Sequence, residues 1–530
     1  MKYPIGIQDF KSIIADGYVY VDKTALVYEM VSTGKTYFLS RPRRFGKSLL
    51  VSTLKYYYQG EKELFKGLAI DKLEKDWKKY PVFHLDFNTG EYTQPGLLRK
   101  KISGVLSAWE QIYGICNEEE DLGTRFVNIL LKAHEQTGLR AVVLIDEYDK
   151  PILDVLETEY KTIASGVEMT LEENHRNILK SFYSAFKTAD QDLQFVLLTG
   201  VTKFSQVSIF SGFNQPKDIS MNPHYEALCG ITEEELYTCF DVQIGELADS
   251  LGVTKEEAKA EMKRRYDGYH FSPNMMDIYN PYSILRVLDE KRFSDFWFST
   301  GSPSYLVRLI NHYKDDLNEF TGEYYEPSEF IDYKADIEKP LPMIYQSGYL
   351  TIKDYEPLTD TFKLDFPNNE VKNGFVTMVA SNYFSTEDNA KSWILNIVRA
   401  LRQADIEKVM TLFRSFLKGV PYSVRRREDE RDCERDFQYT FYLIFRMISC
   451  YYTYIEKQQS EGRVDCIIET PTDVFIFEFK LDGSADEAMK QIEDRGYAVP
   501  YEADTRKVYR IGAVFSSTEG TVSEWKIISE

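Results

Sequence analysis

The chain has 530 residues, 43% of them hydrophobic and 14% aromatic, so two to four domains with real cores are expected. Its formal net charge is −20, which excludes nucleic-acid binding by charge spread over the whole molecule and leaves only a local basic patch. The six cysteines form no C-x-x-C pair, and the chain has neither an apolar signal core nor a run of about 18 apolar residues. We therefore expect a soluble cytoplasmic protein with no membrane segment, disulfide scaffold or structural zinc.

Four apolar, strand-like runs alternate with helical stretches in the first 225 residues. They lie at 36–40, 82–87, 141–146 and 195–200. Each contains few charges and ends in a polar residue, as parallel strands do when both faces are buried and functional groups lie at the carboxyl ends. The pattern predicts an α/β domain with a parallel sheet over 1–225.

The stretch SRPRRFGKS (40–48) lies between the first of these runs and a predicted helix. Gly46 permits close approach of the backbone, Lys47 suits the terminal phosphates of a nucleotide, and Ser48 suits a magnesium ion. Arg41 stands where the usual G-x-x-x-x-G-K-[ST] pattern has its first glycine, so the GKS triplet alone also fits a basic surface turn.

Acidic residues at a later strand end supply context for this loop. Asp146 can hold magnesium through water and Glu147 can orient the attacking water, although a solvated acidic turn is the alternative. At the end of the run 195–200, Thr199 and Thr202 either sense the γ-phosphate or cap a loop. Strand, loop, GKS, helix and acidic strand end together favour a nucleotide site.

The predicted site takes ATP and Mg²⁺, with Ser48 and Asp146 toward the metal and Glu147 as a catalytic residue. Its nucleotide-binding residues are Arg43, Arg44, Phe45, Gly46, Lys47, Ser48, Leu49, Asp146 and Thr199. Arg264 and Arg265 either reach the nucleotide from a lid or lie on a solvated helix face, the commoner place for arginine.

Three segments resemble the bacterial AAA-ATPase-like family, which is related to the archaeal-type ATPases. They are GIQDFKSIIADGYVYVDKTALVYEM, FLSRPRRFGKS and LIDEYDKPI. That family commonly writes its phosphate loop RPRRFGKS, so the resemblance implies that Arg41 belongs to a working loop. It leaves open whether Arg41, Arg43 or Arg44 contacts the nucleotide. The family also keeps the segment Gly17 to Thr24, whose Asp22 and Lys23 are expected to fix the approach to the first strand.

Residues 226–355 predict helices followed by a short strand or hairpin at SGYLTIKDY. We interpret this region as a helical lid with a winged-helix-like module, 356–428 as a connecting region, and 429–530 as the last domain. The arginines of RRREDERD (425–432) either touch a phosphate backbone or lie in a solvated segment, which a mixed charge run favours. A long aromatic helix, FQYTFYLIFRMISCYY, follows.

Three charged residues interrupt an apolar strand pattern near the C-terminus. Asp465 lies in one predicted strand, and after a turn at 471–473 the next strand carries Glu478 and Lys480 on one face. Charges there are costly unless paired or metal-bound, and two neighbouring carboxylates favour a divalent cation. The pattern indicates a metal site in which Lys480 assists an activated water. An edge strand with a Glu–Lys–Asp salt bridge is the alternative.

The spacing Asp-x12-Glu-x-Lys resembles the core of the PD-(D/E)XK nuclease superfamily, in a branch often fused to AAA-ATPase-like domains. The resemblance implies a restriction-endonuclease-like α/β domain. It makes Asp465 and Glu478 metal ligands, Glu434 a supporting ligand, Lys480 catalytic, and Gln491 a group that positions substrate or water.

We therefore expect a P-loop ATPase whose nucleotide cycle controls a C-terminal Mg²⁺-dependent nuclease acting on DNA, in a chain able to form homo-oligomers. A second hypothesis is a regulatory nucleotide switch whose C-terminal domain only binds nucleic acid or a partner. A third is an ATPase with a decayed nuclease fold.

Overall fold

The computed structural model describes residues 1–114, 120–164, 166–204, 216–297, 304–313, 320–331, 340–383, 390–419, 466–470 and 472–529. The chain divides into two compact units, Met1–Val371 and Lys372–Glu530, which are described separately below. The charged stretch 425–432 and the predicted aromatic helix lie outside the described residues. None of the helices in these ranges has the length and apolarity that crossing a bilayer requires.

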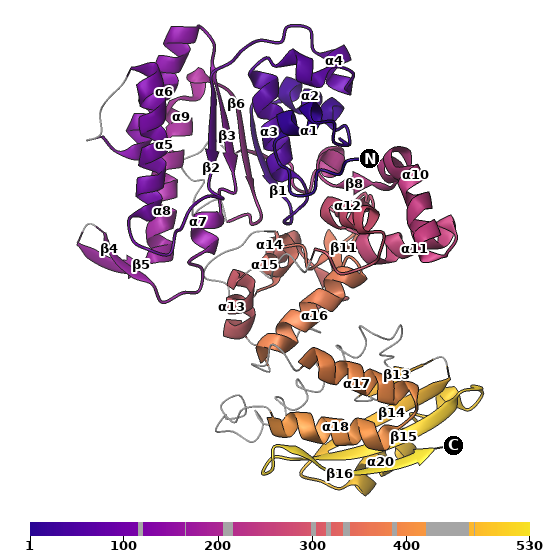
Figure 1. Cartoon of the computed structure of the whole chain (residues 1–530). Helices are drawn as coiled ribbons and strands as arrows, with labels where there is room; N and C mark the ends of the chain where they lie inside the picture. Colours follow the sequence, from indigo (N-terminus) through magenta and orange to yellow (C-terminus); the bar gives the residue numbers. More distant parts are fainter. Residues whose placement is uncertain are drawn as a thin grey trace. The chain divides into compact units, whose positions relative to one another are not determined.

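A five-stranded sheet with the order β2-β3-β6-β1-β7 forms the centre of the first unit (Figure 1). Its neighbouring strands are all parallel, as the sequence predicted. The strands are β1 (Thr36–Ser40), β2 (Val82–Asp86), β3 (Ala141–Asp146), β6 (Leu193–Gly200) and β7 (Lys217–Asp218). The interior strand β3 is buried at all of its positions, which explains its continuous apolar run.

Helices cover both faces of this sheet (Figure 1). One face carries α1 (Phe10–Ala15), α2 (Thr24–Thr33), α3 (Lys47–Tyr58) and α4 (Ala69–Leu73). The other carries α5 (Leu97–Tyr113), α6 (Leu122–Thr137), α8 (Leu171–Tyr183) and α9 (Ala185–Thr188). The short helix α7 (Lys150–Leu153) and a hairpin of β4 (Lys161–Ala164) and β5 (Val167–Thr170) precede α8.

The strand order decides which residues can meet. Strand β6 lies between β1 and β3, with Ser40 paired to Gly200 and Ile145 paired to Leu198. On the other side of β3, Asp146 is in register with Asp86. Because these strands are parallel, the loop after β1 and the polar ends of β6, β3 and β2 share one edge of the sheet.

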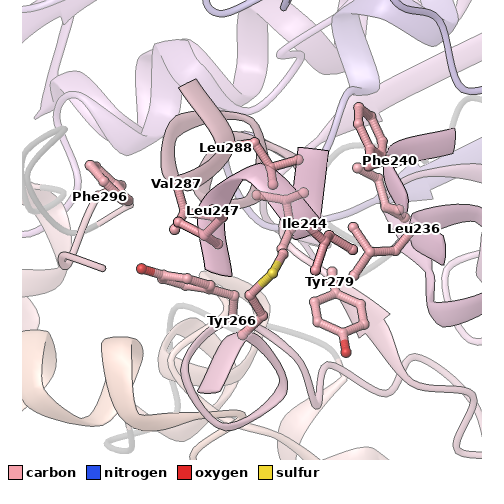
Figure 2. Close-up of a cluster of buried hydrophobic side chains, with 12 residues drawn as sticks. Leu236, Phe240, Ile244, Leu247, Tyr266, Tyr279, Val287, Leu288 and Phe296 are labelled. Carbon is pink, nitrogen blue, oxygen red and sulfur yellow. The ribbon is translucent and has the colours of Figure 1, made fainter. Parts of the chain in front are cut away.

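A helical cluster follows the sheet in the chain. It consists of β8 (Ile231–Thr232), α10 (Glu233–Leu251), α11 (Lys255–Tyr266), β9 (Ile278–Tyr279) and α12 (Pro281–Glu290). Thr232 with Glu235 and Thr254 with Glu257 form capping boxes that start α10 and α11. Figure 2 shows the buried side chains of this cluster, including Phe240, Tyr266 and Phe296.

The rest of the first unit contains short helices and a small antiparallel sheet of order β10-β12-β11. The elements are α13 (Ser304–Tyr313), β10 (Tyr324–Tyr325), α14 (Pro327–Phe330), α15 (Leu341–Gln346), β11 (Thr351–Glu356) and β12 (Thr361–Asp365). The strand predicted at SGYLTIKDY is β11, whereas the winged-helix-like interpretation stays a prediction. Helix α16 (Asn369–Tyr383) begins in this unit and continues past residue 371.

The second unit contains a mixed sheet of order β13-β14-β15-β16, in which only β14 and β15 are parallel to each other. Its described elements are α17 (Ala390–Arg402), α18 (Ile406–Gly419), β13 (Cys466–Glu469), β14 (Asp473–Leu481), α20 (Ala485–Asp494), β15 (Lys507–Ser516) and β16 (Thr521–Ser529). Val474 and Ile476 pack with Met489 and Ile492 of α20. The phenylalanines of β14 lie on the opposite face, so the predicted alternation along this strand is confirmed.

Candidate functional sites

The loop after β1 has the form of a phosphate cradle. Gly46 has a φ of 95° and lies directly before Lys47, the first residue of α3, and a Cβ at Gly46 would meet no atom within 4 Å. Lys47 is buried, and its Nζ donates to the carbonyl oxygens of Arg41 at 2.9 Å and Pro42 at 3.1 Å. Open space at a helix N-terminus with a buried ammonium group beside it suits a bound phosphate.

Arg41, which replaces the first glycine of the usual pattern, is 2% exposed and supports the loop from inside. Its guanidinium group donates to the carbonyl oxygens of Ser220 at 2.6 Å and Tyr225 at 3.4 Å, and it lies 4.0 Å from the ring centre of Phe271. These contacts turn Arg41 away from solvent and onto the body of the unit.

The other loop residues also contact the helical cluster and the segments after it. The ring of Phe45 packs edge-on against Tyr269 and Phe271, 4.7 Å and 5.5 Å away. Arg43 and Arg44 are exposed; Arg43 lies over the ring of Tyr305 and Arg44 over the ring of Tyr282. Of the three loop arginines, these two are therefore the ones open to solvent.

The acidic residues lie at the end of β3, next to Thr199 of β6. Asp146 is 4% exposed, and its Oδ1 accepts from the Thr199 hydroxyl at 2.5 Å and from the backbone N–H of Glu147 at 3.1 Å. Glu147 has a φ of 49°, an unfavourable conformation for a residue with a Cβ, of the kind that clusters at functional sites. The structure thus brings Thr199 against the acidic end of β3, a contact that the sequence did not predict.

Burial and charge act against each other in this cluster. Burial lowers the pKa of Lys47, while Glu147, Asp146 and Asp149 raise it. Burial likewise raises the pKa of Glu147, and the positive charge of Lys47 opposes that rise. Burial outweighs the attraction of Lys47, so the pKa of Glu147 stays raised, and Glu147 accepts a proton at a higher pH than an exposed glutamate does.

Two acidic residues of this edge were not identified from the sequence. Asp149 is buried, has a pKa raised to about 6 by burial, and accepts from the backbone N–H groups of Val201 and Thr202 at 2.9 Å and 2.6 Å. Asp86 ends β2 and is in register with Asp146. The sequence did contain a signal for each: Asp149 is the third acidic residue of LIDEYD, and Asp86 is the last residue of the strand VFHLD.

Other residues singled out in the sequence contact neighbouring elements or residues of their own helix. Asp22 accepts from Thr24 and from the backbone of Ala69, and Lys23 forms an ion pair with Glu235. The segment around Asp22 and Lys23 therefore joins α2 to α4 and α10. Arg264 and Arg265 both form ion pairs with Glu261 on their own helix, as a solvated helix face does.

The second candidate site lies on β14 and α20 of the C-terminal unit. Glu478 is 2% exposed, and Lys480 is 3.3 Å from its Oε1. The Lys480 ammonium also donates to the side-chain oxygen of Gln491 on α20. The structure therefore brings Glu478, Lys480 and Gln491 together, whereas Glu434 and Asp465 lie outside the described residues.

A glycine lets α20 come close enough for this contact. Gly512 on β15 is paired with Glu478, and a Cβ at Gly512 would lie 2.8 Å from the carbonyl oxygen of Ala485 and 3.0 Å from the Cβ of Ala488. Such distances are too short for any larger residue without displacement of the helix. Gly512 thus helps to place Gln491 above β14.

The donor atoms fit the expected metal at the first site. Among the described residues, no three His, Cys, Asp or Glu side chains form a ready-made metal cluster. A hydroxyl from Ser48 and a carboxylate from Asp146, completed by phosphate and water oxygens, is a set that suits Mg²⁺. At the second site only Glu478 of the predicted ligands is described.

Comparison with known proteins gives matches over both regions. Residues 4–210 match the family described as predicted AAA-ATPase, and residues 432–525 match the PD-(D/E)XK nuclease superfamily. A relative from Azotobacter chroococcum mcd 1, "Uncharacterized protein in vnfD 5'region", is 32% identical over 527 residues, which covers 98% of each chain. The similarity to that protein therefore extends through both units and the region that joins them.

Proposed function

This chain belongs to the AAA-ATPase-like family and ends in a domain of the PD-(D/E)XK nuclease superfamily, and from that premise we propose that it hydrolyses ATP and uses the nucleotide cycle to control nuclease action on DNA. The observation that carries the first half is the convergence of Lys47, Asp146, Glu147 and Thr199 at one edge of the parallel sheet.

In the proposed reaction, nucleotide phosphates take the Lys47 ammonium from the two loop carbonyls that now hold it. Backbone N–H groups at the start of α3 face the same phosphates. Glu147 orients the attacking water, and Thr199 holds Asp146 in place through its hydroxyl. Ser48 and Asp146 would hold Mg²⁺, which would supply positive charge to offset that of the phosphates.

At the nuclease-like site, Lys480 is placed to stabilise negative charge on a scissile phosphate while Gln491 fixes its direction. Glu478 is the described residue for a metal ion, which when bound activates a water molecule.

The test measures both activities in the full chain. Wild type is expected to hydrolyse Mg²⁺–ATP, and Lys47→Ala to lose ~100-fold or more of the rate, as when one preorganised charge-stabilising group is removed. Wild type is also expected to cleave at least one member of a panel of DNA forms in Mg²⁺, with a similar loss in Lys480→Ala.

The outcomes separate the hypotheses. Equal ATP hydrolysis by wild type and Lys47→Ala would reject the ATPase assignment. Nucleotide binding without any metal-dependent cleavage of DNA would instead support the regulatory switch with an inactive nuclease fold.

A further inference from the structure

The phosphate loop is held by a tryptophan that also holds the start of α16. Trp297 is 6% exposed, and its indole Nε1 donates to the carbonyl oxygen of Arg43 at 3.1 Å. Its ring lies 5.2 Å from that of Tyr349, which follows α15. A change in the path of the loop at Arg43 therefore acts directly on a buried aromatic side chain with little room to move.

The same tryptophan contacts α16 through its backbone. The N–H of Trp297 donates to Oε1 of Glu370 at 2.6 Å, and the Ser283 hydroxyl donates to the other carboxyl oxygen at 2.7 Å. Glu370 is 1% exposed and lies in the first turn of α16. Breaking either hydrogen bond would leave a buried polar group unsatisfied, so the contact is costly to lose.

The beginning of α16 is fixed at further points. Asn368 accepts from the backbone N–H of Val371 and donates to the carbonyl oxygen of Asp267, at 3.1 Å and 2.8 Å. Lys353 donates to the carbonyl oxygen of Pro367. Glu370 and the residues beyond the unit boundary at Val371 belong to the same helix, α16.

We infer that Trp297 and Glu370 relay the nucleotide state of the phosphate loop to α16, the helix that continues from the ATPase unit into the residues of the second unit. This relay rests on the proposed function, since it needs a nucleotide that binds the loop. It gives that function a physical route: loop carbonyl, indole N–H, tryptophan backbone, buried carboxyl group and helix.

Hydrogen–deuterium exchange over residues 369–383 in the full chain tests the relay. Wild type is expected to change its exchange there when Mg²⁺–ATP is added, with a smaller change for Mg²⁺–ADP. Trp297→Phe keeps the aromatic packing but removes the indole N–H, so the ATP-dependent change should be lost while a fluorescent ATP analogue still binds. Trp109→Phe is the matched control, because Trp109 of α5 packs on Phe83 of β2 and Phe126 of α6, on elements that do not include the phosphate loop or α16.

A second pair of variants guards against simple misfolding. Glu370→Gln retains an oxygen that accepts from Trp297 and should keep the ATP-dependent change, whereas Glu370→Ala should abolish it. Wild type that binds ATP without any change over 369–383, or Trp297→Phe that keeps the change, would overturn the relay and leave the ATPase proposal intact. Wild type that fails to bind ATP would overturn both.

Discussion

Arg41 departs from the usual phosphate-loop pattern, and the residues around it form contacts that accommodate its side chain. Arg41 occupies a position that glycine usually takes, and the fork of its guanidinium group reaches two backbone carbonyls while its flat face covers Phe271. The sequence identified the loop and its charges. It did not show the orientation of Arg41, because the partners Ser220, Tyr225 and Phe271 lie about 180 to 230 residues away along the chain.

Arg41→Lys tests this supporting role. Lysine keeps the charge but cannot make the fork or the stacked contact, and each hydrogen bond lost to a charged group is worth about 1.5–3 kcal/mol. We expect a lower melting temperature together with weaker ATP binding, measured by thermal unfolding and by titration of a fluorescent ATP analogue. Arg264→Lys, the same change at an exposed position, should alter neither. Weaker ATP binding with unchanged stability would instead indicate direct contact between Arg41 and nucleotide.

Glu370 gives a prediction about pH. Burial raises its pKa to about 8 from an ordinary 4.5, so the folded protein binds this proton more tightly than the unfolded chain. The resulting stabilisation is complete below pH 4.5 and is lost as the pH rises toward about 8. Glu370→Gln cannot titrate, so the melting temperature of wild type should fall more than that of the variant between these limits. Parallel pH profiles for the two proteins would contradict this assignment.

At the scale of elements, the sequence predicted those helices and strands whose apolar residues recur with a regular local spacing. The four buried strand runs, the capped helices α10 and α11, and the two-faced strand β14 each follow from neighbouring residues. The order of the strands in the sheet could not be predicted from neighbouring residues. It placed β6 between β1 and β3, and with it Thr199 against Asp146. Asp86 and Asp149 were missed for the same reason, since register and backbone partners decide their roles.

Gly512→Ala tests whether close packing of α20 on β15 maintains the nuclease-like site. The added Cβ must displace the helix, and overpacking of this kind costs about 1–3 kcal/mol. Stability should fall, and any DNA cleavage should fall further because Gln491 moves away from Lys480. Gly104→Ala in α5, where a Cβ would meet nothing within 4 Å, is the matched control and should leave both unchanged or raise stability slightly. Unchanged cleavage in Gly512→Ala would show that Gln491 is dispensable.

At the scale of the whole molecule, the two candidate sites belong to different compact units of one chain with a net charge of −20. Glu370, one of the last residues of the first unit, accepts hydrogen bonds from both Ser283 and Trp297 of the same unit. A signal between the sites therefore has a structural starting point in the ATPase unit.

If the nucleotide controls the nuclease and not the reverse, variants at the two proposed sites should affect the two activities differently. Lys47→Ala should remove the part of DNA cleavage that depends on ATP. Lys480→Ala should lower cleavage ~100-fold or more and leave ATP hydrolysis within about twofold of wild type, since it alters no residue of the proposed nucleotide site. Both rates are measured on the same preparations, with and without ATP. Cleavage that is equal with and without ATP in wild type would contradict nucleotide control.

The contacts that the phosphate loop makes with later residues also decide whether the ATPase-like segment could be separated from the rest of the chain. The recognisable ATPase sequence spans residues 4–210, yet the groups that hold the loop come from later in the chain, including Phe271, Trp297 and Gly348, which leaves no room for a Cβ beside Pro42. A fragment cut after the last recognisable ATPase residue would keep every atom of the loop and lose the surface that shapes it. The proposed nucleotide site therefore depends on residues outside 4–210, and we expect that an exchange of the helical cluster for another would require a matching loop.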